Sequence, residues 1–206
     1  MSKIRVFIAD DHAMVRMGLA TLLGSKKDIS VVGEAEDGET TVRKVLETKP
    51  DVVLMDLMMP DVDGAEATAR LHQALPDLKI VILTSADTTD GISRALSNGA
   101  VGALTKGEDF STLVDVIRDI AAGKTCISPE IRRMLDQDPP APALTRRQQE
   151  ILRMAMQGFS YSDMSRHFGI REDSVRRHIA ETCAKLGAAN RLEAVAIALR
   201  KHLLKI

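Results

Sequence analysis

Residues 52–60 read Val-Val-Leu-Met-Asp-Leu-Met-Met-Pro, and this stretch predicts the fold of the first part of the chain. Four apolar residues run without a polar break into the carboxylate of Asp56, which is typical of a strand buried on both faces of a parallel sheet. Asp56 then lies at the carboxyl end of that strand, where open α/β sheets bind their ligands. Pro60 and Gly64 predict a sharp turn just beyond it. Taken alone, the stretch is more simply explained by an aspartate that only caps a turn, so the other strands have to decide.

Short apolar runs alternate with helical patterns over the first 122 residues. The predicted strands cover residues 6–9, 29–33, 52–55, 80–83 and 101–104, and the predicted helices cover residues 12–23, 39–46, 65–75, 90–97 and 110–122. Five strand–helix pairs predict a five-stranded parallel sheet with helices on both faces. The flavodoxin-like strand order 2-1-3-4-5 would make the first and third strands neighbours.

The charge of the chain is divided between its two parts. Residues 1–143 carry 16 Lys and Arg against 23 Asp and Glu, whereas residues 144–206 carry 12 against 6. A basic last part suggests that only this part meets a polyanion such as DNA. Three prolines within residues 139–142 favour an extended spacer. We therefore predict domains at 1–122 and 144–206, joined by a linker at 123–143.

Composition limits the class of protein. An apolar fraction of 45% is ordinary for globular domains. Cys126 and Cys183 are far apart and lack metal-ligand spacing, which fits a reducing compartment. The chain has neither an apolar leader region nor a run of membrane-spanning length, so we expect a cytoplasmic protein without a membrane partner.

Polar side chains follow four of the predicted strands. They are Asp10, Asp11, Asp56, Thr84 and Lys106. Three carboxylates in one crevice are costly unless a cation neutralises them, and hard oxygen ligands suit Mg²⁺. The lysine could balance the charge of a phosphoryl oxygen and the threonine could donate to another. The set predicts a site for a phosphoryl group attached to, or passing through, an aspartate.

Residues 4–122 resemble the receiver domain of bacterial two-component response regulators. The resemblance rests on the acidic pair after the first strand, on Asp-Leu-Met-Met-Pro-Asp-Val-Asp-Gly at 56–64, on Thr84-Ser85 and on Lys106. It implies that Asp56 accepts a phosphoryl group from the phosphohistidine of a sensor histidine kinase, and that the protein is not a turnover enzyme. It also implies roles for the surrounding residues: Asp11, Asp56 and the Met58 carbonyl would bind Mg²⁺, Asp10 would assist through water, and Thr84 and Lys106 would hold the phosphoryl oxygens. One position departs from the family, because Ala103 replaces the usual aromatic residue that follows the threonine inward. How phosphorylation is relayed is therefore open, and from the sequence alone a tyrosine at this position is expected to strengthen the relay.

The last part has the pattern of a compact four-helix domain with a helix-turn-helix. Thr145 has the form of a capping box, Gly158, Gly169 and Gly187 end helices, and a helix over about 172–186 would enter the major groove. Residues 144–203 resemble the LuxR-type DNA-binding domain of the NarL/FixJ subfamily. The matching residues are Leu144-Thr145, Glu150-Ile151-Leu152, Gly158 with Ser160, Val175-Arg176, His178, Lys185-Leu186-Gly187, and Arg191 with Glu193-Ala194-Val195. By this resemblance the DNA contacts are Ser174, Arg176, Arg177 and Lys185. Departures at Arg171, Tyr161-Ser162-Asp163-Met164 and Ala180 mean that the target sequence cannot be borrowed from relatives.

These observations predict a transcription factor that is phosphorylated on Asp56, dimerises and then binds promoter DNA. The small residues Ala194, Ala196 and Ala198 suggest that the last helix forms a dimer surface. An aspartate-nucleophile phosphohydrolase would need an acid two residues after the nucleophile, where this chain has Met58. A phosphorylation-independent DNA-binding regulator, with the receiver as a dimerisation module, remains the main alternative. The sequence does not identify the kinase, the promoters, the sign of regulation or the lifetime of the phosphorylated state.

Overall fold

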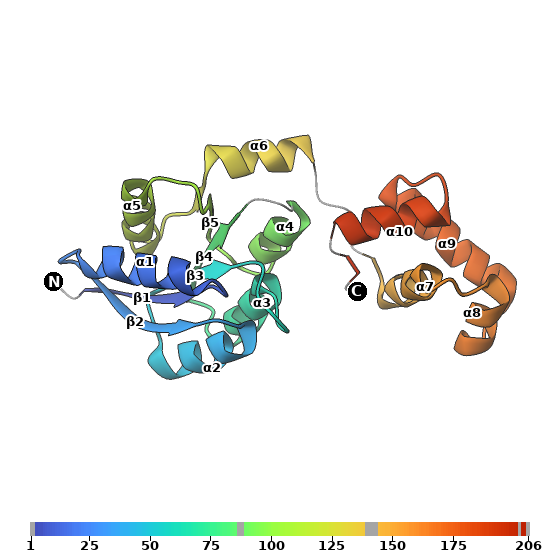
Figure 1. Ribbon diagram of the computed structural model, residues 1–206, viewed down its shortest axis with the longest axis horizontal. Coiled ribbons are helices and arrows are strands. Elements are labelled where there is room, and N and C mark those ends of the chain that lie inside the picture. Colours follow the sequence, from blue (N-terminus) through green and yellow to red (C-terminus); the bar gives the residue numbers. More distant parts are fainter. Residues whose placement is uncertain (1–2, 86–88, 139–143, 202, 205–206) are drawn as a thin grey trace. The chain divides into compact units, whose positions relative to one another are not determined.

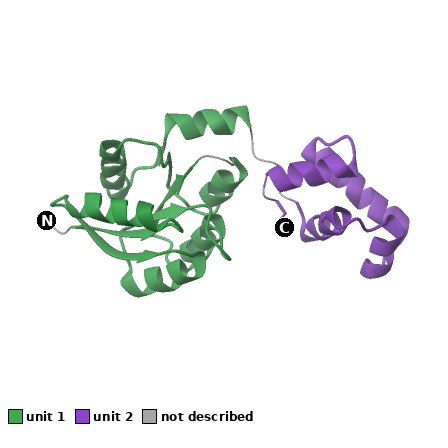
Figure 2. Cartoon of the chain, in the orientation of Figure 1, with its two compact units in different colours: residues 1–139 green, residues 140–206 purple. Residues whose placement is uncertain are grey.

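The computed structural model describes residues 3–85, 89–138, 144–201, 203 and 204, and it divides into two compact units at residues 1–139 and 140–206 (Figure 2). The proline-rich spacer expected at residues 139–143 lies outside the described residues. Among the described residues, no helix is both long and apolar enough to cross a membrane.

The first unit is a parallel sheet between two layers of helices (Figure 1). Its strands are β1 (Ile4–Ala9), β2 (Ile29–Ala35), β3 (Val52–Asp56), β4 (Lys79–Thr84), β5 (Gly102–Thr105) and β6 (Cys126–Ile127). Its helices are α1 (Ala13–Gly24), α2 (Gly38–Thr48), α3 (Gly64–Ala74), α4 (Thr89–Ser97), α5 (Phe110–Ala121) and α6 (Pro129–Gln137).

The strand order is β2-β1-β3-β4-β5-β6, which confirms the predicted flavodoxin-like order and adds one strand. The prediction of five strands was therefore wrong by one, because β6 pairs with β5 through only two residues. A two-residue strand has no hydrophobic period, so the sequence carries no signal for it. As a consequence, residues 126–137 of the expected linker include a strand and a helix of the first unit.

Two apolar layers cover the faces of the sheet. On one face, side chains of β1, β3 and β4 such as Phe7, Val53 and Ile82 pack with α2, α3, α4 and α6. On the other face, alternate residues of the same strands pack with α1 and α5. All residues of β3 are buried, as the unbroken apolar run predicts.

The second unit contains the four helices that the sequence predicts. They are α7 (Arg146–Met156), α8 (Tyr161–Phe168), α9 (Glu172–Leu186) and α10 (Arg191–Arg200). Thr145 and Ser160 both form capping boxes, and Gly169 and Gly187 end their helices with φ of 63° and 66°, a left-handed conformation that glycine adopts at little cost. The hydrophobic core of the second unit is formed by Ile151, Leu152, Met164, Val175, Ile179 and neighbouring apolar residues.

Helix α10 corrects one expectation. Ala194 and Ala198 are fully buried in the core of the unit, and only Ala196 of the three alanines is exposed. Val195 is buried and Leu199 packs on the same core. A dimer surface on this helix must therefore be built around Ala196 and its exposed neighbours.

Candidate functional site

The register of the sheet brings the predicted site residues to one edge. Ala9 of β1 pairs with Met55 of β3, so Asp10 and Asp56 follow at adjacent strand ends. Asp56 pairs with Leu83 of β4, and Thr84 pairs with Thr105 of β5. Because the strands are parallel, one side chain from each strand end reaches the same edge. The sequence-based expectation that these residues gather is fulfilled in the structure.

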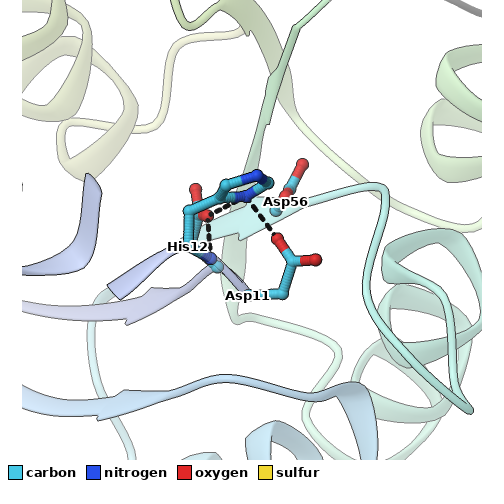
Figure 3. A group of neighbouring side chains, drawn as sticks. Asp11, His12 and Asp56 are labelled. Carbon is cyan, nitrogen blue, oxygen red and sulfur yellow. Dashed lines mark hydrogen bonds and ion pairs between the residues drawn. The ribbon is translucent and has the colours of Figure 1, made fainter. Parts of the chain in front are cut away.

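The acidic residues form one cluster with a histidine (Figure 3). One ligand atom each from Asp10, Asp11, His12 and Asp56 lies within 4.8 Å of every other. Asp10 and Asp56 are buried, whereas Asp11 and His12 are exposed. The imidazole of His12 points toward the carboxylate of Asp11, with 2.5 Å between Nδ1 and Oδ1. The backbone amide of His12 also donates to Oδ1 of Asp10, at 2.9 Å.

Lys106 links the two buried carboxylates. Its Nζ lies 2.9 Å from Oδ2 of Asp56 and 2.8 Å from Oδ2 of Asp10. The backbone amide of Lys106 donates to the carbonyl of Thr84 at 2.7 Å, which fixes the end of β5 beside the end of β4. The ammonium group therefore lies at the point where it offsets the charge of both carboxylates.

The ionisation of these groups reflects burial and this pairing. Burial raises the pKa of the Asp56 carboxyl above its usual value, while the hydrogen bond and charge of Lys106 act in the opposite direction. Burial by itself lowers the pKa of Lys106, but its hydrogen bonds to Asp10 and Asp56 outweigh burial, so the pKa is raised. Lys106 is thus held in its charged form beside a carboxylate whose ionisation is opposed by burial.

The loop after β3 is folded back tightly onto the strand end. The amide of Gly64 donates to the carbonyl of Leu57 at 3.0 Å. A Cβ at Gly64 would lie 2.0 Å from the carbonyl oxygen of Asp56, so only glycine fits. The Asp63 side chain then caps α3 by accepting from the amide of Glu66 at 2.8 Å. In the same loop, the Met58 amide lies 3.4 Å from Oδ1 of Asp56, which keeps the loop close to the carboxylate.

The donor set fits a hard divalent cation. Carboxylate oxygens of Asp10, Asp11 and Asp56 lie close together. Asp10 and Asp56 are buried, so bulk water screens their negative charge only weakly, and oxygen ligands of this kind suit a hard divalent cation. Lys106 balances only part of this negative charge. These residues, with the Met58 carbonyl in the adjoining loop, would hold Mg²⁺.

Thr84 lies at the end of β4 and is 3% exposed. Ala103, on the neighbouring strand, is fully buried and belongs to the apolar cluster that includes Ile92 of α4 and Ile131 of α6. Ala103, two residues before the partner of Thr84 on β5, is therefore surrounded by packed aliphatic side chains.

The predicted DNA contacts lie on α9. Val175 and Ile179 are buried, Ser174 is half-buried, and Arg176 and Arg177 are exposed. The Arg171 side chain makes no cap hydrogen bond, as its chemistry predicts, and Glu172 and Asp173 occupy the first turn. Lys185, near the other end of α9, donates to Oε1 of Gln148 on α7 at 3.1 Å.

Sequence reasoning missed three contributors. His12 adjoins the acidic pair, which was a usable signal for its place in the cluster. Gly64 was recognised only as a turn residue, because its close approach to Asp56 depends on how the loop folds back. Tyr161 was noted only as a departure from the family pattern, yet the guanidinium carbons of Arg176 and Arg191 lie 4.4 Å and 5.3 Å from the centre of its ring.

Comparisons with known proteins agree with this architecture. Residues 6–118 match the family described as "Response regulator receiver domain", and residues 142–198 match "Bacterial regulatory proteins, luxR family". The response regulator protein VraR of Staphylococcus epidermidis is 34% identical over 207 residues, which cover 98% of this chain and 99% of VraR. VraR of Staphylococcus aureus strain NCTC 8325 is 33% identical with the same coverage.

Solved structures show the same similarity. The response regulator ChrA of a heme-sensing two-component system has a TM-score of 0.60 and 36% identity, covering 99% of this chain and 100% of ChrA. An RcsB–DNA complex has a TM-score of 0.67 at 23% identity, covering 97% of this chain and 99% of RcsB, and this likeness shows the fold alone. The chain therefore belongs to the response regulators of bacterial two-component systems, and it is a transcription regulator that joins a receiver domain to a LuxR-type DNA-binding domain.

Proposed function

We propose that Asp56 is the phosphoacceptor of this response regulator and that its phosphorylation promotes dimerisation and binding to promoter DNA. The observation that carries the proposal is the placement of Lys106, whose ammonium bridges the buried carboxylates of Asp56 and Asp10 at the carboxyl edge of the sheet. The exposed side chains of His12 and Asp11 adjoin them, so the edge is open to a phosphodonor.

In the proposed transfer, an oxygen of the Asp56 carboxylate attacks the phosphorus atom of a kinase phosphohistidine. The new oxygen–phosphorus bond forms as the nitrogen–phosphorus bond breaks, and the electron pair returns to the imidazole of the kinase. Lys106 would balance the charge of the phosphoryl oxygens, and the Thr84 hydroxyl would donate to one of them. Mg²⁺ held by Asp10, Asp11, Asp56 and the Met58 carbonyl would supply further positive charge. Asp56 is a covalent acceptor in this scheme and not the nucleophile of a turnover enzyme.

In the second unit, we propose that Ser174, Arg176, Arg177 and Lys185 contact double-stranded DNA. The support is the exposure of Arg176 and Arg177 on a helix whose opposite side, with Val175 and Ile179, is buried. The functional limits 1–122 and 144–206 belong to the same proposal, as does a cytoplasmic location, where a bacterial regulator meets promoter DNA and a kinase.

The site assignment is tested by intact-mass measurement after incubation with a small phosphodonor and Mg²⁺. The wild-type chain should gain the mass of one phosphoryl group, and Asp56→Asn should gain none. Asp61→Asn is a matched control, because it makes the same substitution in the same loop at a position with φ of 59°, which asparagine tolerates. Persistent labelling of Asp56→Asn would overturn the assignment.

A second candidate is DNA binding that does not depend on phosphorylation. It is favoured by Ala103, which is fully buried and offers no ring to follow Thr84 inward. DNA affinity measured with and without the phosphodonor separates the two. An affinity that increases only for labelled protein supports the phosphorylation-gated regulator, and an equal affinity supports the alternative.

A further inference from the structure

A cluster of two arginines and one tyrosine borders the predicted recognition helix. The guanidinium carbon of Arg176, from α9, lies 4.4 Å from the centre of the Tyr161 ring, and that of Arg191, from α10, lies 5.3 Å from it. Tyr161 is the first residue of α8. Three helices therefore each contribute one side chain to a positively charged group, Tyr161, Arg176 and Arg191, which we call the Tyr161 cluster.

Both guanidinium groups are held in place by a further contact. Arg176 donates to Oε1 of Glu172 at 2.7 Å, and Arg191 donates to the carbonyl of Phe159 at 3.3 Å. Each of these bonds uses one of the five N–H donors that a guanidinium carries, so donors remain for a ligand. Because their orientation is already restricted, less side-chain freedom is lost when they bind an anion.

The cluster opens into a hollow of about 720 Å³. Its lining includes Arg176, Ala180 and Ala184 of α9, Tyr161, and Asn190 and Arg191 at the start of α10. Two arginines and no carboxylate are among the lining residues, so the hollow favours an anion. The small side chains of Ala180 and Ala184 leave room for a bulky strand to approach the arginines.

The hollow runs along α9, the helix that we propose enters the major groove of DNA. Arg176, Ala180 and Ala184 are four residues apart and share one face of α9, next to the face that carries Arg177. When a recognition helix lies in the major groove, the sugar–phosphate backbone of DNA passes along the side of that helix. Guanidinium groups bind phosphate through paired N–H donors.

We propose that the Tyr161 cluster binds a backbone phosphate of double-stranded DNA, and that Tyr161 positions the two arginines for this contact. The inference rests on the proposed DNA-binding function of the second unit. The proposal assigns Arg176 to the DNA backbone, a contact that does not depend on the base sequence. It also adds Tyr161 and Arg191 to the proposed DNA-binding residues, although neither belongs to the recognition helix.

The test uses the full-length chain treated with phosphodonor and Mg²⁺, and a 30-base-pair duplex of random sequence as the probe. The dissociation constant is measured over a series of salt concentrations. Each lost phosphate contact lowers the slope of log affinity against log salt by about 0.9. Arg176→Gln should lower the slope by about this amount. Tyr161→Leu should also weaken binding and lower the slope, although it removes no charge.

Arg146→Gln is the matched control. Arg146 is exposed on α7 and is paired with Glu150 one helical turn away, as Arg176 is paired with Glu172, and its substitution changes net charge equally. Its slope should equal that of the wild-type chain. Glu172→Gln should bind more tightly, because Glu172 competes with the phosphate for Arg176.

The proposed role of the Tyr161 cluster would be overturned if the salt slopes of Arg176→Gln and Arg146→Gln were equal, or if Tyr161→Leu bound DNA with the affinity and slope of the wild-type chain. Either result would leave the proposed DNA-binding function of the second unit intact. If the wild-type chain itself did not bind the duplex, the proposed DNA-binding function would be overturned as well. Thermal unfolding reports whether Tyr161→Leu keeps its fold. If that variant unfolds, the comparison of Arg176→Gln with Arg146→Gln decides alone.

Discussion

The backbone amide of Ser128 donates a hydrogen bond of 2.9 Å to the carbonyl oxygen of Ala103. Ser128 is also the N-cap of α6, and its hydroxyl accepts from the amide of Ile131 at 3.3 Å. Helix α6 therefore begins on the strand that carries Ala103. At its other end, Oδ2 of Asp138 accepts from the Thr89 hydroxyl of α4 at 3.1 Å. The helix that leads to the second unit is thus attached to both β5 and α4.

Ala103→Tyr should destabilise the chain. From the sequence alone, a ring here is expected to strengthen the relay from Asp56, but Ala103 is fully buried in a cluster with Ile92 and Ile131. Overpacking of this kind costs about 1–3 kcal/mol, and the ring would disturb the attachment of α6. Denaturant unfolding measures the loss, with Ala122→Tyr at an exposed position as the control. Unchanged stability of Ala103→Tyr would show that the cluster has room for the ring.

Asp56→Asn should stabilise the metal-free chain at neutral pH. The pKa of Asp56 is raised above its usual 3.8, so the folded state holds the proton more tightly than the unfolded state does. The free energy of unfolding of the wild-type chain therefore falls as the pH rises from about 3.8 through the folded pKa. Asparagine abolishes this loss, and Lys106 keeps Asp10 as its partner.

The measurement is the melting temperature of both proteins between pH 3.5 and pH 7 in the presence of a chelator. We expect Asp56→Asn to melt at a higher temperature than the wild-type chain at pH 7, where each gain of about 1 kcal/mol would correspond to roughly 2–4 °C in a chain of this size. The difference should shrink as the pH falls. A lower melting temperature of Asp56→Asn at pH 7 would mean that its ion pair with Lys106 outweighs the cost of burial.

Mg²⁺ should raise the melting temperature of the wild-type chain, because a ligand that binds only the folded state stabilises it by mass action. A concentration 100 times the dissociation constant should contribute about 2.7 kcal/mol. Asp11→Ala should lose most of this effect, since Asp11 belongs to the acidic cluster. Asp77→Ala removes an exposed carboxylate outside the cluster and should respond as the wild type does. Equal responses of the two variants would place the cation elsewhere.

Arg177→Ala should relax DNA specificity at one base position. Its side chain is 69% exposed, and its Nε lies 3.9 Å from Oε1 of Glu181, a looser pairing than that of Arg176 with Glu172. Loss of a bidentate base contact costs about 1–3 kcal/mol for the preferred sequence and little for others. Selection from a randomised duplex pool, followed by affinity measurements, gives both values. An equal loss for specific and random duplexes would assign Arg177 to the backbone.

Ala196→Glu should block binding to paired half-sites while leaving the fold intact. Ala196 is exposed on α10, and Leu192, one turn earlier, is 72% exposed, so the two form an apolar face that a second copy would cover. A buried glutamate on this face would be costly to desolvate. Cooperative binding to a duplex with two half-sites is the readout, and Ala74→Glu, the same substitution at an exposed position of α3, is the control. Cooperativity equal to that of the wild type would exclude this face as the dimer surface.

The sequence alone determined which residues form the first five strands and which side chains follow them at the carboxyl edge, whereas the strand order was a hypothesis that the structure confirms. Each strand was an unbroken apolar run, and the side chain that followed it identified its end, as with Asp56 and Lys106. Such signals are local, because hydrophobic periodicity and turn residues act over a few neighbours. The four helices of the second unit were found for the same reason, through their capping boxes and terminal glycines.

Tertiary structure decided the features that join distant residues. Strand β6 has two residues and is defined by its pairing with β5, so no hydrophobic pattern in the sequence predicts it. The need for glycine at position 64 arises from its approach to the Asp56 carbonyl, and the contact of the Arg176 guanidinium with the Tyr161 ring joins two helices. On α10, the composition of three alanines could not tell which were buried, because burial depends on where α7 and α9 pack against it. Contacts between residues far apart in the chain are set by the packing of whole elements, and that information is absent from any short stretch of sequence.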